Sequence, residues 1–201
     1  KILSLLKGAM AELSLGDPSL FETDIGPVID LAAKKTLLEH IQRMEREATL
    51  IYKAPLSDAL KNECFVPPAV FLLRSIKALG GEHFGPILHV VTFARGDINK
   101  VIEEINQSAY GLTLGVHTRN EHLAKEIDKQ VNIGNVYINR SQIGAVVGVQ
   151  PFGGQGLSGT GPKAGGPGYL FRFSTEQTRT TNTSAVGGNT ALLSLKADTG
   201  P

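Results

Sequence analysis

Cys64 is the only cysteine among the 201 residues, so it is the first candidate for a catalytic nucleophile. A thiol becomes a reactive thiolate when a helix N-terminus or a neighbouring cation lowers its pKa. Here the acidic Glu63 precedes the cysteine, and Pro67-Pro68 follows soon after it. These neighbours favour an ordinary packed cysteine. A single cysteine also excludes an intramolecular disulfide and suits a reducing compartment.

Histidine is the other residue type whose spacing could indicate catalysis or metal binding. The five histidines are His40, His83, His89, His117 and His122. None forms an HxxxH or HExxH pair, and His117 and His122 are spaced so that a helix would place them on different faces. No serine lies in a GxSxG turn. The spacing therefore predicts no metal site, and it leaves a Ser-His-Asp triad undetermined.

A glycine-rich run spans residues 143–168, IGAVVGVQPFGGQGLSGTGPKAGGPG, and holds ten of the 23 glycines. Within it, residues 159–164 match GxGxxA, the fingerprint of dinucleotide-binding turns. That fingerprint normally follows a strand and opens a helix, whereas here it follows PFGGQGLS and has Pro162 at its fourth place. Lys163 is followed by Ala164, so a Walker loop also fails. We therefore interpret this half of the run as a structural turn.

Residues 82–86, EHFGP, directly precede the most strand-like segment of the chain, ILHVVTF. The carboxylate of Glu82 could accept hydrogen bonds from hydroxyls such as those of a ribose, and Phe84 could offer a ring face to a ligand. A plain turn from a loop into a strand would explain the same residues. Spacing alone leaves both interpretations open.

The overall composition excludes several classes of protein. The chain is 41% hydrophobic and carries a formal net charge of +1, with Lys and Arg spread along its length. It therefore has no basic face for nucleic acid and no polybasic membrane patch. No apolar run approaches the roughly 18 residues of a transmembrane helix, and the N-terminal KILSLLKGAMAEL lacks the features of a signal peptide. A globular protein with one sizeable core or two small ones is expected.

Hydrophobic periodicity predicts helices that alternate with short strands. Helices are expected at about 2–13, 28–48, 98–109 and 121–131, and strands at about 49–52, 65–73, 87–93, 112–118 and 135–139. Asp97 is expected to cap the third helix, and a capping box at 118–121 the fourth. Such alternation implies βαβ crossovers. We therefore predict an α/β fold with a mostly parallel open sheet and flanking helices.

The C-terminal part of the sequence has a different character. Residues 173–201 are rich in Thr, Ser and Asn with short apolar residues between them, which is typical of an extended arm that lies on another surface. We expect a main domain over residues 1–172 and an arm over residues 173–201. Lys1 opens an already amphipathic segment, so we also expect a chain that begins within a domain.

Four motifs resemble the catalytic-domain half of the aldehyde dehydrogenase superfamily. They are EHFGPILHVV, NQSAYGLTLGVHT, GNVYINR and PFGGQGLSGTG, which occur in the order and with the spacing of that family, and SLGDP and DIGPVID near the start also fit. The glycine run and the tail TTNTSAVGGNTALLSL look like the L-glutamate γ-semialdehyde (1-pyrroline-5-carboxylate) dehydrogenase part of bifunctional proline utilization A. The resemblance implies an incomplete aldehyde dehydrogenase catalytic domain.

The resemblance also implies a reaction, the NAD⁺-dependent oxidation of L-glutamate γ-semialdehyde to L-glutamate in proline catabolism. In the family, a cysteine thiolate attacks the aldehyde, the adduct gives hydride to NAD⁺, and a water activated by a glutamate hydrolyses the thioester. By this resemblance, Glu82 would bind the nicotinamide ribose and Phe84 would pack near the nicotinamide. Gly144 and Ala145 would offer backbone N–H groups to the α-carboxylate of the substrate, and Phe152 would line its aliphatic stem.

The chain lacks other parts of the family pattern. The nucleophilic cysteine, the glutamate base and the Rossmann coenzyme domain lie upstream in the family, and Cys64 does not occupy the nucleophile's position. We therefore expect no catalytic residue in this chain and no activity from it alone. The resemblance further implies a cytoplasmic homo-oligomer, in which FAD would belong only to an upstream proline dehydrogenase domain that could also mediate peripheral membrane association.

Two other functions compete with this interpretation. One is a different aldehyde dehydrogenase, of the succinate semialdehyde or betaine aldehyde type. The other is a non-catalytic module that uses residues 173–201 to bind a partner. Dependence on an α-amino acid head group in the substrate would distinguish the first interpretation from another aldehyde dehydrogenase.

Overall fold

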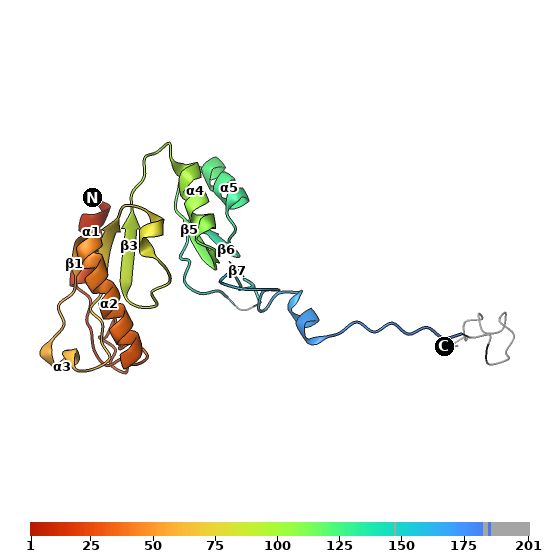
Figure 1. Ribbon diagram of the computed structural model, residues 1–201, viewed down its shortest axis with the longest axis horizontal. Coiled ribbons are helices and arrows are strands. Elements are labelled where there is room, and N and C mark those ends of the chain that lie inside the picture. Colours follow the sequence, from red (N-terminus) through yellow and green to blue (C-terminus); the bar gives the residue numbers. More distant parts are fainter. Residues whose placement is uncertain (147, 183–184, 186–201) are drawn as a thin grey trace. The chain divides into compact units, whose positions relative to one another are not determined.

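A computed structural model describes residues 1–146, 148–182 and 185 of the chain (Figure 1). These residues belong to two compact units. The first unit comprises residues 1–143 and 154–160, and the second comprises residues 144–153 and 161–201. Within the described residues, no helix combines the length and the apolar character needed to cross a membrane.

The N-terminal part of the first unit contains a three-stranded sheet in the order β1-β2-β3. Its elements are α1 (Ile2–Ala11), α2 (Leu31–Glu47), β1 (Thr49–Lys53), α3 (Asp58–Lys61), β2 (Ala69–Leu73), the 3₁₀ helix η1 (Ile76–Leu79) and β3 (Ile87–Val91). Strands β2 and β3 are parallel, with Ala69 opposite Ile87 and Leu73 opposite Val91. Strand β1 pairs with β2 in the antiparallel direction. Strand β2 begins directly after Pro67 and Pro68, because proline has no backbone N–H to donate to a neighbouring strand inside a sheet.

Helix α2 packs the main core against this sheet. Asp30 caps its first turn, because the Asp30 carboxylate accepts a hydrogen bond of 2.7 Å from the Ala33 N–H. The apolar face of α2 then repeats at helical spacing through Leu37, Ile41 and Met44, all nearly inaccessible to solvent. These side chains form one cluster with Val66, Ala69, Phe71 and Leu73. Residues 80–86, between η1 and β3, lie against this core where Gly85 approaches Leu37.

A βαβ unit follows along the chain. It consists of β5 (Thr113–Val116), α5 (Glu121–Gln130) and β6 (Asn135–Ile138). Helix α4 (Ile98–Gln107) and β4 (Tyr110–Gly111) precede it, and β7 (Gln155–Gly156) pairs antiparallel with β4. Strands β5 and β6 are parallel, as a crossover through α5 requires. Helices α4 and α5 lie side by side in Figure 1. The Asn106 side chain links them, because it donates to the Gln130 carbonyl and accepts from the Asn132 N–H.

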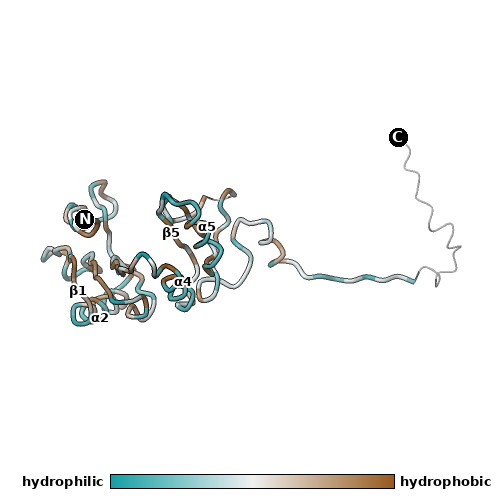
Figure 2. Tube along the Cα trace, turned by 90° about the horizontal axis from the view of Figure 1, so that it is seen from above, coloured by the Kyte–Doolittle hydropathy of each residue, from teal (hydrophilic) through white to brown (hydrophobic). Residues whose placement is uncertain are grey.

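The second unit is poor in regular structure. Its one described helix is the short 3₁₀ helix η2 (Tyr169–Phe173), and Phe152 and Ala164 form an isolated antiparallel bridge. Residues 174–182 follow an extended course and carry mainly hydrophilic colours in Figure 2. They show no helix or strand. The rest of the predicted arm, apart from residue 185, lies outside the described residues, and the domain boundary at residues 172 and 173 stays a prediction.

The predicted α/β class is confirmed, with two differences in detail. The parallel pairs β2–β3 and β5–β6 occur in separate small sheets rather than in one, and β1 is antiparallel. The predicted helix starts were partly wrong. Asp97 precedes α4 but makes no capping hydrogen bond through its side chain. The cap of α5 is Asn120, whose side chain accepts from the Leu123 N–H, and not a box that begins at Thr118.

Candidate functional site

The loop of residues 80–86, here called the 80–86 loop, carries Glu82 and Phe84 between η1 and β3. It begins at Gly80, whose φ of +82° lies in the left-handed region that glycine adopts without strain. At its other end, a Cβ atom on Gly85 would lie 2.5 Å from Leu37 Cδ1. Glycine at this position therefore lets the loop approach α2 closely before Pro86 leads into β3.

The 80–86 loop presents Glu82 and Phe84 to solvent. The Phe84 side chain is 90% exposed, and Glu82 is also exposed and makes no hydrogen bond or ion pair with another described residue. With His83 and Gly85 they line a groove of about 640 Å³, whose other wall is formed by Pro27, Val28, Ile29 and Ala33. An apolar groove with a carboxylate and an aromatic ring at its edge suits a ligand that has both hydroxyls and a flat ring.

Arg43 of α2 holds the start of this loop. One guanidinium nitrogen donates to the Ala78 carbonyl at 3.2 Å, and the other donates to the Leu79 carbonyl at 2.7 Å. These carbonyls belong to the last residues of η1, where backbone acceptors have no partner inside the helix. Glu47 accepts a further hydrogen bond of 3.0 Å from the guanidinium. Two protein carbonyls and a carboxylate thus fix the orientation of Arg43.

Three histidines that are far apart in the sequence meet beside the 80–86 loop. The rings of His40 and His83 stack with their centroids 3.3 Å apart, and the Nε2 atoms of His40 and His89 are 2.8 Å apart. His40 is the one buried polar residue among those described, with 4% exposure. Spacing did not reveal this cluster. The only signal was a histidine on the apolar face of α2, between Leu37 and Ile41.

The surroundings of two members of the cluster, His40 and His89, disfavour their protonated forms. Burial lowers the pKa of His40 to about 4, and the nearby His83, His89 and Arg43 act in the same direction. Burial also lowers the pKa of His89, again with His83 and Arg43 contributing. Within the described residues, no group of three His, Cys, Asp or Glu side chains has the arrangement to hold a metal ion.

The lowered pKa of His40 predicts that acid lowers the stability of the folded state around α2 and β3. Between about pH 6.5 and pH 4, the unfolded chain binds protons that His40 in the folded chain does not bind, so stability falls as pH falls through this window and is fully present above it. After correction for intrinsic exchange rates, we expect the free energy of opening measured by amide hydrogen exchange in α2 and β3 of the full-length protein to fall by roughly 2 kcal/mol across this pH window. His40→Gln keeps a donor and an acceptor but does not titrate, so it should reduce this pH dependence. An unchanged pH dependence in that variant would contradict the assignment to His40.

Gly144 and Ala145 lie in the second unit, directly before a glycine-containing turn. Gly144 has φ +69° and Gly148 has φ +76°, so both occupy the left-handed region. The turn is closed by the Gln150 N–H, which donates to the Val146 carbonyl at 2.8 Å, and by the Gln150 side chain, which accepts from the Val146 N–H. The Ala145 N–H makes no hydrogen bond to another described residue. Successive backbone N–H groups in such a turn can form a concave site for an anion.

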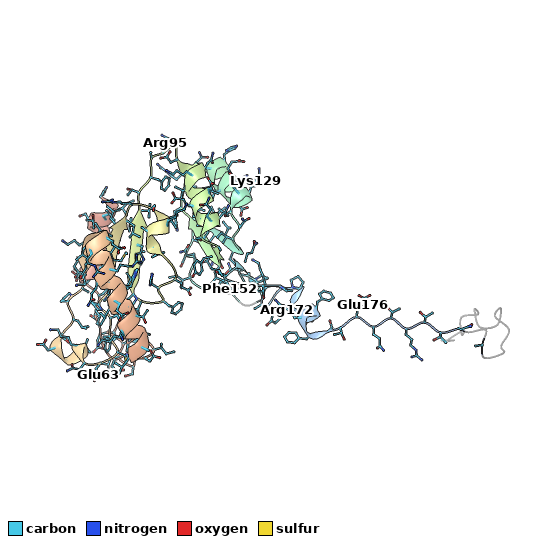
Figure 3. The ribbon with its side chains drawn as sticks, viewed as in Figure 1. Glu63, Arg95, Lys129, Phe152, Arg172 and Glu176 are labelled. Carbon is cyan, nitrogen blue, oxygen red and sulfur yellow. The ribbon has the colours of Figure 1, made fainter. Side chains whose placement is uncertain are left out.

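Phe152 follows this turn and is held by backbone pairing. Its N–H donates to the Ala164 carbonyl at 3.0 Å, and its carbonyl accepts from the Ala164 N–H at 2.9 Å. Its side chain is half-buried and is labelled in Figure 3. Gly144, Ala145 and Phe152 therefore share the second unit, whereas Glu82 and Phe84 belong to the first.

The GxGxxA match of residues 159–164 is not a strand-turn-helix unit. No α-helix follows it among the described residues, and its last residue is the bridge partner of Phe152. A methyl group on Gly161 would collide with the guanidinium of Arg172, which is labelled in Figure 3. The Arg172 guanidinium thus packs over Gly161.

Cys64 takes part in the backbone framework of the first unit. It is a free, half-buried cysteine after α3, and its carbonyl accepts a hydrogen bond of 2.8 Å from the Val28 N–H. The Lys34 ammonium donates to the carbonyls of Lys61 and Glu63 on either side of that turn. Three hydrogen bonds therefore tie the segment around Cys64 to the first turn of α2 and to the residues just before that helix.

The chain matches known proteins over most of its length. The model of the "Aldehyde dehydrogenase family" matches residues 1–179. Bifunctional protein PutA of Klebsiella aerogenes is 49% identical over 176 residues, which cover 85% of this chain and 13% of that protein. A 1-pyrroline-5-carboxylate dehydrogenase of Geobacillus kaustophilus is 38% identical over 174 residues, which cover 85% of this chain and 33% of that protein.

Solved structures give the same result. Proline utilization A of Bradyrhizobium japonicum, in the structure of its D779W variant, superimposes with a TM-score of 0.85 and 52% sequence identity. The match covers 92% of this chain and 18% of that one. The chain therefore spans less than a fifth of the length of these PutA proteins. With a family model that matches nearly the whole sequence, the chain belongs to the aldehyde dehydrogenase family.

Proposed function

We propose that this chain forms part of the catalytic domain of an NAD-dependent L-glutamate γ-semialdehyde dehydrogenase that acts in proline catabolism. The observation that carries the proposal is the 49% identity with a PutA protein over 176 residues. Relatives named 1-pyrroline-5-carboxylate dehydrogenase support the same substrate rather than succinate semialdehyde or betaine aldehyde. The chain would act as a part of a larger cytoplasmic, homo-oligomeric enzyme whose nucleophilic cysteine and glutamate base lie outside these residues.

Glu82 and Phe84 fit the coenzyme role. The carboxylate of Glu82 is exposed and unengaged among the described residues, so it is available to accept hydrogen bonds from the two hydroxyls of a ribose. The exposed ring of Phe84 offers an apolar face beside it. Bound NAD⁺ would accept the hydride. The role of these residues would be to hold the nicotinamide end of the coenzyme in one orientation, which lowers the entropic barrier to the reaction.

Gly144, Ala145 and Phe152 fit the substrate role. L-glutamate γ-semialdehyde carries a carboxylate and an ammonium at one end and its reacting carbonyl at the other, so specificity requires an anion holder set apart from the nucleophile. The Ala145 N–H, which makes no hydrogen bond to another described residue, could donate to the carboxylate, with the backbone of Gly144 beside it. The half-buried ring of Phe152 offers an apolar surface for the aliphatic stem.

Substrate profiling of the full-length enzyme that carries this chain tests the proposal. We expect kcat/KM for L-glutamate γ-semialdehyde to exceed the values for succinate semialdehyde, betaine aldehyde and propanal by about tenfold or more, because only the first has an α-amino acid head group to anchor. The measurement is NADH formation at matched substrate concentrations. Equal or higher kcat/KM for succinate semialdehyde or betaine aldehyde would overturn the substrate assignment while leaving the family unchanged.

A further inference from the structure

The position of Glu82 depends on its neighbours, because its own side chain makes no hydrogen bond or ion pair with another described residue. The exposure pattern of the loop alternates. Glu82 and Phe84 are exposed, whereas His83 between them is half-buried. A contact that holds His83 inward therefore turns the two flanking side chains outward. His83 and the preceding carbonyls of η1 are the points at which α2 could fix the loop.

His83 is held by two contacts. Its ring lies flat against the ring of His40, with 3.3 Å between centroids and 19° between planes. Its Nε2 atom lies 3.2 Å from the Leu79 carbonyl, and since a carbonyl can only accept, Nε2 must carry the proton. The same carbonyl accepts from Arg43 at 2.7 Å. Leu79 thus joins the guanidinium of α2 to the imidazole of the loop.

The hydrogen bonds also assign the protons of the remaining cluster. Arg43 is always a donor, so the Nδ1 atom of His40, 3.3 Å from the guanidinium, must be the acceptor. The proton of neutral His40 is then on Nε2, from which it is donated to Nε2 of His89 at 2.8 Å. His40 is thereby fixed between α2 and β3 and gives His83 a rigid ring to stack on.

From these contacts we propose that Arg43 and His40 of α2, with His83, are positioning residues that set the orientation of Glu82 and Phe84 toward the coenzyme. This inference rests on the proposed coenzyme role of the 80–86 loop. Arg43 holds the carbonyls on which the loop begins, and His40 holds the ring in the middle of it. The guanidinium is suited to this task because its planar fork reaches two carbonyls at once, which a lysine ammonium on a flexible stem does not reproduce.

Arg43→Lys in the full-length enzyme is the first test. We expect the Kd and KM for NAD⁺ to rise by about five- to tenfold, with the KM for the aldehyde unchanged, because the loop that meets the coenzyme loses its fixed start. Arg46→Lys is the matched control, since Arg46 lies on the same helix, is exposed and makes no contact with the loop. Equal effects of the two substitutions, or an unchanged affinity for NAD⁺ in Arg43→Lys, would overturn the proposal.

His83 gives a second test, in which the residues of α2 are left unchanged. His83→Gly removes both the stack and the hydrogen bond, and we expect it to weaken NAD⁺ binding at least as much as Arg43→Lys. His83→Phe keeps a flat ring against His40 and should cause a smaller loss. If glycine and phenylalanine at this position behave alike, stacking on His40 does not position the loop.

A double-mutant cycle separates this inference from the proposed function. If Arg43 acts through Glu82, Arg43→Lys should add little to the loss already caused by Glu82→Ala. If Glu82→Ala alone leaves NAD⁺ binding unchanged, the coenzyme role of the loop fails, and the positioning inference fails with it. If Glu82→Ala weakens NAD⁺ binding and Arg43→Lys adds its full effect on top, the coenzyme role stands and the positioning inference is wrong.

Discussion

In the full-length enzyme, Ala145→Pro is expected to lower kcat/KM for L-glutamate γ-semialdehyde by about tenfold or more, while kcat/KM for propanal changes little. Proline has no backbone N–H, so the substitution removes one donor from the glycine turn. A charge-assisted hydrogen bond of this kind contributes about 1.5 to 3 kcal/mol. Propanal has no carboxylate and does not use that donor. Steady-state kinetics with both aldehydes measure the difference.

Ala145→Gly is the matched control for this experiment, because it removes only a methyl group and keeps the N–H. It should retain discrimination between the two aldehydes. Proline also restricts the residue before it, and Gly144 has a left-handed φ of +69°, so some rearrangement of the turn is expected in the proline variant. Equal losses for both aldehydes would mean that the turn supports the fold of the site and does not anchor the carboxylate.

Local pattern was enough to locate most elements of this fold. The repeat of Leu37, Ile41 and Met44 marks α2 as a helix with one buried face, and the β-branched residues of ILHVV mark β3. Strand direction was not encoded locally. Strand β1 follows α2 directly and reads like the other strands, yet it pairs antiparallel to β2, and only its partner in space determines that.

The helix caps show a similar limit. Thr118 and Glu121 have the spacing of a capping box, but Asn120 lies next to the helix and its side chain reaches the Leu123 N–H first. Thr118 instead accepts through its hydroxyl from the Asn120 N–H, and its own backbone pairs with the Asn139 side chain. Asn139, directly after β6, thus binds the backbone of Thr118, the residue that the local pattern had assigned to the cap.

Candidate residues could be proposed from the sequence where they are exposed residues of one segment, whereas contacts across segments were missed. Glu82 and Phe84 come from one five-residue motif, so the family resemblance was enough to name them as candidates, and their role stays a prediction. His40 and His89 are 49 positions apart, and His83 joins them only because Gly85 allows its loop to approach α2. Hydrophobic periodicity could have raised the question, since a histidine on an apolar helix face needs a buried partner.

The exposed carboxylate of Glu82 gives the second large prediction. Glu82→Ala in the full-length enzyme is expected to raise the Kd for NAD⁺ by about ten- to a hundredfold, because two hydroxyls of the ribose would lose a charged acceptor. Glu82→Gln keeps one acceptor oxygen without the charge and should cause an intermediate loss. Titration calorimetry with NAD⁺ measures the affinity directly, without any contribution from the chemical step.

Glu121→Ala is the matched control, because Glu121 is an exposed glutamate in the first turn of α5 and does not line the groove beside Glu82. It should bind NAD⁺ as the unaltered enzyme does. The folded state of the Glu82 variants should also be unchanged, since that side chain is exposed and makes no hydrogen bond or ion pair with another described residue. A loss of affinity in Glu82→Ala without a loss of stability would therefore report on the ligand and not on the fold. An affinity equal to that of Glu121→Ala would remove Glu82 from the coenzyme site.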